Sequence, residues 1–112
     1  MQKMVNMIGN ERLYNAIKAL VTGGGDARER VVMACQILQP IRQIELQDEL
    51  WLRLQKILNN AKRGGAMKNQ DGEVIRDAFT FTAQGKRNST YTKIAEDIYR
   101  LYVDELTHRQ NK

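Results

Sequence analysis

The residues that could perform acid, base or nucleophilic chemistry are few and scattered in this chain of 112 residues. The one histidine, His108, lies in a tail that we expect to fray, and the one cysteine, Cys35, falls on the apolar side of a predicted helix. A buried cysteine without basic neighbours has a high pKa and is a poor nucleophile. Adjacent acidic residues such as Asp48 and Glu49 point to different sides of a helix. We therefore predict no catalytic residues and a protein that is not an enzyme.

Metal and phosphate sites are also poorly supported by the sequence. A single cysteine and a single histidine cannot form an ordinary zinc site, and one histidine cannot supply the two inward-facing Glu-x-x-His units of a carboxylate metal site. The triplet Gly23-Gly24-Gly25 resembles a phosphate-binding loop, but Asp26 follows it and would compete for the amides that an anion needs. The sequence predicts no metal, no cofactor and no small-molecule substrate.

A basic block is the strongest functional signal. Residues 62–93 contain seven basic and three acidic residues, a net charge of +4, whereas the whole chain has +5. If the two polar loops in this block lie at the same end of the fold, their cations form one surface that can hold phosphate oxygens of DNA or RNA. The alternative is a solvated face whose charges keep the protein soluble. The predicted nucleic-acid-binding residues are Lys62, Arg63, Lys68, Lys86, Arg87 and Lys93.

Several large apolar residues lie off the predicted buried faces or in the methionine-rich N-terminal segment. Adaptable methionines and exposed aliphatic side chains are typical of interaction surfaces, whereas the alternative is a core that surrounds the helices more completely. The predicted partner-binding residues, for another protein or a second copy of the chain, are Met4, Met7, Ile8, Leu52, Tyr99 and Val103.

We therefore expect a small accessory or adaptor protein that acts by protein–protein binding, including self-association, with residues 62–93 contacting nucleic acid. An alternative is a small DNA-binding transcriptional regulator that uses residues 90–106, since TKIAEDI resembles the first helix of a helix-turn-helix. The tight turn and the second helix of that motif do not follow it. A further alternative is an enzyme whose site forms only at a subunit interface.

The elements that must position these residues are helices, since apolar residues recur at helical spacing and almost no strand pattern is present. Asp26 with Glu29 forms a capping box, and glycine clusters separate the segments. We predict an all-α, single-domain bundle of about five helices, with residues 11–22, 27–38, 47–62, 72–83 and 90–107. The predicted buried stripes include Val31, Ala34, Cys35 and Leu38 in the second helix and Leu50, Leu54, Ile57, Leu58 and Ala61 in the third.

Three segments keep two interpretations, and the C-terminal tail has one. Residues 1–9 extend the first helix or form a flexible apolar arm, and residues 108–112 form a frayed tail after the last. Residues 40–46 form an extended crossing with Ile41, Ile44 and Leu46 inward, or Pro40 begins one long helix to Ala61. Residues 72–83 form a helix capped by Asp71, with Val74, Ala78 and Phe81 on one face, although FTFT alternates as in a strand.

Composition places the chain among ordinary globular proteins, with 42% hydrophobic and 28% charged residues. The sequence contains no apolar run near the length of about 20 residues that crosses a bilayer, and no signal-peptide pattern. We therefore expect a cytoplasmic protein without a membrane partner.

Overall fold

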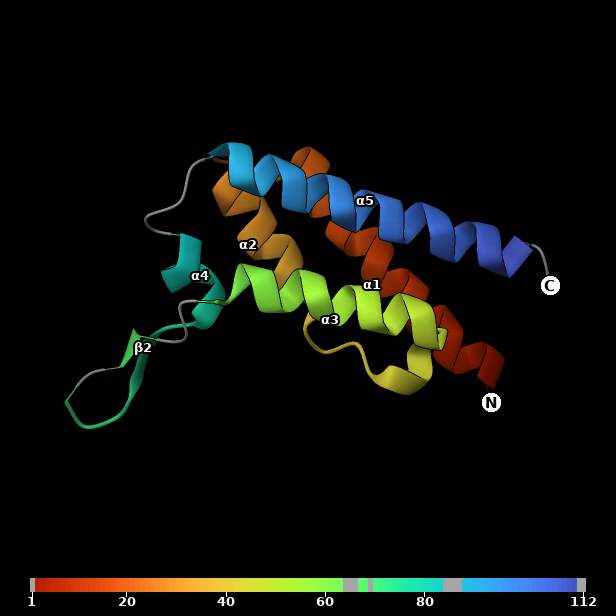
Figure 1. Cartoon of the computed structure of the whole chain (residues 1–112), viewed down its shortest axis with the longest axis horizontal. Coiled ribbons are helices and arrows are strands. Elements are labelled where there is room, and N and C mark those ends of the chain that lie inside the picture. The colour runs from red at the N-terminus through yellow and green to blue at the C-terminus, as the bar shows by residue number, and fades with distance from the viewer. Residues whose placement is uncertain (1, 64–66, 69, 84–87, 111–112) are drawn as a thin grey trace.

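Five α-helices and a small hairpin form the computed structural model, which describes residues 2–63, 67–68, 70–83 and 88–110 (Figure 1). The all-α prediction is confirmed, and the short strands are an addition to it. The helices are α1 (Gln2–Thr22), α2 (Ala27–Leu38), α3 (Asp48–Ala61), α4 (Ala78–Ala83) and α5 (Asn88–Gln110), with the 3₁₀ turn η1 (Gln43–Glu45) and the strands β1 (Met67–Lys68) and β2 (Val74–Arg76).

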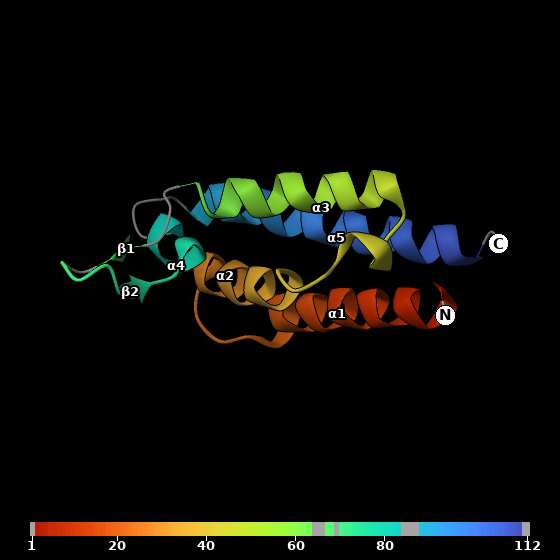
Figure 2. The same cartoon turned by 90° about the horizontal axis from the view of Figure 1, so that it is seen from below.

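The four long helices lie side by side in an elongated bundle that measures 50 × 30 × 21 Å (Figures 1 and 2). Helices α1 and α3 run in one direction, and α5 runs antiparallel to both. Helix α2 contacts α1, α3, α4 and α5, and helix α5 contacts α1, α2 and α3, so these two helices connect the bundle. The hairpin and α4 lie at the end opposite to both chain termini.

The core is built from the stripes that helical periodicity predicts. In α2 and α3 the residues predicted to be inward are the ones that are buried. Helix α5 buries Tyr91, Ile94, Ile98 and Leu101 between its neighbours. Burial of these aliphatic and aromatic side chains is the main stabilising contribution, at roughly 1.5–3 kcal/mol for each large one.

Helix α2 begins where its cap predicts. The Asp26 carboxylate accepts a hydrogen bond of 3.1 Å from the backbone N–H of Glu29. This bond satisfies one of the amides that have no partner inside the helix. Gly25 has a φ of 84° just before the cap, which favours glycine there. The loop is therefore an interhelical turn that ends in a carboxylate cap.

The crossing at residues 40–46 agrees with the first of its two interpretations, except at Ile44. Helix α2 ends at Leu38, and Ile41 and Leu46 are buried as predicted. Ile44 is 53% exposed and Glu45 is buried instead, so the prediction for Ile44 is wrong. The turn η1 replaces the two-residue alternation of an extended chain, and it rotates Glu45 toward the core.

Residues 72–83 differ most from the prediction of one helix. Residues Val74–Arg76 pair antiparallel with Met67–Lys68, and only Ala78–Ala83 are helical. The cap is Asp77, whose Oδ1 accepts a 2.8 Å hydrogen bond from the N–H of Thr80, and not Asp71. Val74 is 58% exposed and Phe79 is buried, so the predicted apolar face is wrong; the side chain of Phe81 lies outside the described residues. Gly72, with a φ of 83°, supplies the turn that makes a hairpin possible.

Both ends of the described chain continue as helix. Residues Gln2–Gly9 extend α1, which is the first of the two interpretations of this segment. Gly9 allows η1 to approach closely, because a Cβ atom there would lie 2.8 Å from the carbonyl oxygen of Glu45. At the other end α5 passes through His108 and ends at Gln110, whereas the sequence predicts fraying from His108 onward.

Candidate nucleic-acid interface

Four of the six predicted phosphate contacts have described side chains. Lys62, Arg63, Lys68 and Lys93 belong to the C-terminal end of α3, the hairpin and the N-terminal part of α5, which lie toward the same end of the bundle (Figure 1). Lys68 is exposed on β1 of the hairpin, and Lys86 and Arg87 lie outside the described residues. Lys62 is half-buried, with its Nζ 6.0 Å from the ring centroid of Phe79. Of the four described residues, Arg63 and Lys93 line one hollow between α3 and α5.

This hollow is one half of a longer groove. A cavity of about 420 Å³ contains Arg63 and Lys93, and a second cavity of about 310 Å³ continues along the same two helices. The two are continuous because Asn60, Lys93 and Asp97 line both. We call the whole feature the α3–α5 groove; its basic residues are Arg53, Lys56, Arg63, Lys93 and Arg100.

Charge in the α3–α5 groove is positive. Its five basic residues face two carboxylates, Asp97 in the lining and Asp104 beside Arg53, which leaves a net charge of +3. Arg53 Nη1 bonds to Asp104 Oδ2 across the helices at 2.7 Å, and Lys93 Nζ bonds to Asp97 Oδ1 at 2.7 Å along α5. Both pairs are partly exposed, where an ion pair contributes at most about 1 kcal/mol.

Three basic side chains of the groove carry charge that no ion pair neutralises among the described residues. Lys56 and Arg100 have no ion-pair partner within the described part of the chain. Arg63 Nη2 donates to Asn60 Oδ1 at 2.6 Å, a neutral acceptor that leaves the positive charge uncompensated. An anion in the groove therefore finds charge that no carboxylate has neutralised.

The sequence prediction did not include Arg53, Lys56 and Arg100, because they lie outside the segment of highest positive charge density, residues 62–93. The signal that finds them is spacing. Positions 53, 56 and 60 on α3, continued by 63 just beyond its end, alternate steps of three and four residues, as do positions 93, 97, 100 and 104 on α5. Each set therefore forms one polar stripe. The two stripes meet because α3 and α5 pack antiparallel.

Three of the predicted partner-binding residues, Leu52, Tyr99 and Val103, have described side chains. Leu52 is 68% exposed on the side of α3 that faces away from the core. Tyr99 and Val103 are exposed on α5, about 100° around the helix from the groove. The side chains of Met4, Met7 and Ile8 lie outside the described residues.

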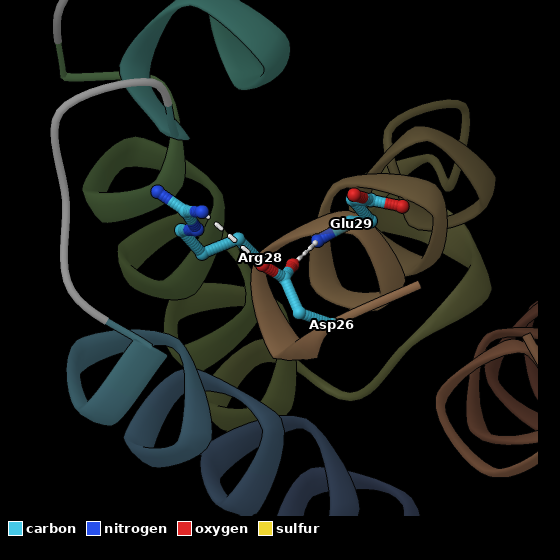
Figure 3. A network of polar contacts seen from close by, with 3 residues as sticks. All are labelled: Asp26, Arg28 and Glu29. Carbon is cyan, nitrogen blue, oxygen red and sulfur yellow. Dashed lines mark hydrogen bonds and ion pairs between the residues drawn. The ribbon is translucent and has the colours of Figure 1, made fainter. Parts of the chain in front are cut away.

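A second hollow, of about 500 Å³, lies between α2 and α4. Asp26 in its rim accepts from the backbone of Glu29 and from Arg28 Nη2, the latter at 3.1 Å (Figure 3). The backbone hydrogen bond from Glu29 lowers the pKa of Asp26 most, which keeps this carboxylate ionised. Gln36 Nε2 bonds to Asp77 Oδ2 at 2.7 Å and ties the two helices together. These polar groups cap and join helices, and Asp26 takes the amide that a phosphate would use.

The one cysteine is placed as a core residue. Cys35 has no exposed surface, and burial raises its pKa to about 12, so it carries no thiolate at neutral pH. Among residues 2–63, 67–68, 70–83 and 88–110, no three His, Cys, Asp or Glu side chains are grouped to hold a metal ion.

None of the helices that the structure describes combines the length and the apolar character needed to cross a bilayer. No protein-family model matches the chain, and neither a curated protein nor a solved structure matches it.

Proposed function

We propose that this protein is a non-catalytic, cytoplasmic accessory protein that binds the phosphate backbone of nucleic acid in the α3–α5 groove. The observation that carries the proposal is the net charge of +3 of the groove, formed by side chains from two packed helices. A buried, unpaired cysteine suits a reducing compartment such as the cytoplasm.

The dimensions of the groove suit a short stretch of backbone. Arg53 of α3 and Arg63, two residues beyond the end of that helix, are ten residues apart, about 15 Å at the rise of a helix and about four base steps of B-form DNA. Four of the five cations, Arg53, Lys56, Lys93 and Arg100, come from regular helices, so their Cα positions are fixed before binding and only their side chains need to be ordered. Phosphate oxygens can replace Asp97 and Asp104 because charge-assisted bonds to either anion are of similar strength.

Charge reversal in the groove tests this proposal. We expect Lys56→Glu and Arg100→Glu each to weaken binding to a random-sequence duplex about tenfold at about 50 mM salt, and to reduce the salt slope of log K by about 1 or more. Binding is measured by fluorescence anisotropy with labelled DNA and RNA duplexes of about 20 base pairs. Circular dichroism shows whether each variant stays folded.

Lys68→Glu is the matched control, because it makes the same charge change at an exposed residue of the hairpin. We expect it to change the affinity less than threefold, as a weak long-range charge effect. Absence of duplex binding by the unaltered protein would overturn the proposal. An equal loss from Lys68→Glu would place the attraction in the overall charge of the protein and not in the groove.

A further inference from the structure

A second surface of α5 carries a cluster of exposed apolar side chains. Tyr14 and Val21 of α1 are 53% and 72% exposed, and Tyr99 and Val103 of α5 are 57% and 37% exposed. The rings of Tyr14 and half-buried Tyr102 lie 6.5 Å apart and connect the two helices. We call these five residues the tyrosine seam.

The five side chains can form one continuous patch because of helical spacing. Tyr99, Tyr102 and Val103 are related by steps of three and four residues, and Tyr14 and Val21 are two turns apart on α1. Helices α1 and α5 run antiparallel, with Tyr14 beside Tyr102, so these two stripes lie along each other. The tyrosine seam lies about 100° around α5 from the basic groove.

Charges beside the seam are arranged symmetrically. Glu11 lies three residues before Tyr14 and Lys18 lies four residues after it, and both are exposed on the same side of α1. Neither has an ion-pair partner among the residues that the structure describes. If a second α1 packs antiparallel across this face, Glu11 of each copy lies opposite Lys18 of the other.

The same symmetry pairs the apolar residues of α5. The midpoint of Glu11 and Lys18 falls between residues 14 and 15, and the midpoint of Tyr99 and Val103 falls at residue 101. Because Tyr14 lies beside Tyr102, these two midpoints are neighbours on adjacent helices. One two-fold axis that runs across both helices therefore passes through both midpoints. That axis places Tyr99 of one copy against Val103 of the other. A surface that complements itself in this way has the property required of an isologous interface.

We propose that the tyrosine seam binds a second copy of this chain in a two-fold symmetric, antiparallel dimer. Glu11 and Lys18 cancel each other, so two copies can approach on this face although each chain carries a charge of +5. The face of α1 and α5 is about 30 Å long and about 20 Å wide, roughly 600 Å² for each copy, which is near the lower limit for a stable interface. We therefore expect a reversible dimer with a dissociation constant in the micromolar range. Both α3–α5 grooves remain exposed in it.

A charge swap tests the symmetric pairing. Sedimentation equilibrium from roughly 1 µM to roughly 1 mM should show a monomer–dimer equilibrium for the unaltered protein. Lys18→Glu places two carboxylates together at two symmetric positions, and we expect it to weaken the dimer about tenfold or more. The double variant Glu11→Lys/Lys18→Glu restores opposite charges across the axis, and we expect its dissociation constant to return to within about threefold of the original.

Tyr99→Asp tests the apolar centre, and Leu52→Asp is its control because Leu52 is equally exposed on a different helix. Tyr99→Asp should give a monomer over the whole range, and Leu52→Asp should dimerise as the unaltered protein does. A strict monomer, failure of the double swap to restore the dimer, or equal loss with Leu52→Asp would overturn the proposal. Duplex binding is measured separately on the Tyr99→Asp monomer, so failure of the dimer and failure of the groove are distinguishable.

Discussion

At the scale of single residues, Gly9 shows how one missing side chain sets the distance between two elements. It lies inside α1, where glycine is unfavourable by about 1 kcal/mol relative to alanine. Its position is explained by the backbone of Glu45, which approaches too closely for a Cβ atom. The sequence shows the glycine but not the reason for it, since the neighbour lies 36 residues away.

We expect Gly9→Ala to destabilise the protein despite the better helix propensity of alanine. Overpacking against a backbone carbonyl costs typically about 1–3 kcal/mol, so the net loss should be about 1 kcal/mol or more. Urea unfolding measures it. Gly24→Ala is the control, because a Cβ atom at Gly24 meets nothing within 4 Å. Equal stability of the two variants would contradict the close approach of η1 to α1.

At the scale of elements, long amphipathic helices were predicted well and the short ones were not. Helices α2 and α3 have a clear cap or a regular apolar stripe over at least three turns, and both signals are local in sequence. The segment 72–83 offers two carboxylates that could cap, Asp71 and Asp77, and too few residues for periodicity to decide between them. Pairing of β2 with β1 decides in favour of Asp77.

Replacement of each carboxylate by alanine shows which of the two, Asp71 or Asp77, caps the helix. Asp77→Ala should lower the free energy of unfolding by about 1 kcal/mol, because Asp77 accepts from Thr80 and also from Gln36 of α2. Asp71→Ala, at an exposed turn residue, should change it by less than about 0.5 kcal/mol. Thermal unfolding followed by circular dichroism compares them, and a larger effect at Asp71 would argue for the helix predicted from the sequence.

The contribution of Asp77 also depends on pH. The backbone N–H of Thr80 is the main cause that lowers the pKa of Asp77 below its ordinary value of 3.8. The folded state therefore favours the charged form, and the stabilisation is present above about pH 4 and is lost as the pH falls below it. The stability difference between the unaltered protein and Asp77→Ala should accordingly shrink in acid.

At the scale of the whole molecule, Cys35 reports on opening of the core. It is completely buried in α2, and burial raises the pKa of its thiol from 9.0 to about 12. A thiol reagent can reach it only when the bundle opens. We expect its reaction at pH 8 to be roughly a thousandfold or more slower in the native protein than in guanidinium chloride, in line with ordinary domain stabilities.

The same burial makes stability fall at high pH. Above about pH 9 the unfolded chain loses the thiol proton while the folded protein keeps it, so the free energy of unfolding decreases as the pH rises toward 12. Cys35→Ala should remove that part of the dependence. Equal thiol reactivity in native and denatured protein would show that Cys35 is not in the core.

The sequence by itself determined the local properties: an all-α chain, the bounds of α2 and α3, the cap at Asp26 and the buried stripes. These depend on contacts within about four residues, which spacing and residue type reveal. Only the tertiary structure decided which flanks of the helices meet. It brought Lys56 and Arg53 to Lys93 and Arg100, and Tyr14 to Tyr102. Such pairs join residues far apart in the chain, because packing of the whole core chooses helix neighbours. The groove therefore combines Arg63 and Lys93 of the predicted basic block with Arg53, Lys56 and Arg100, which lie outside that block.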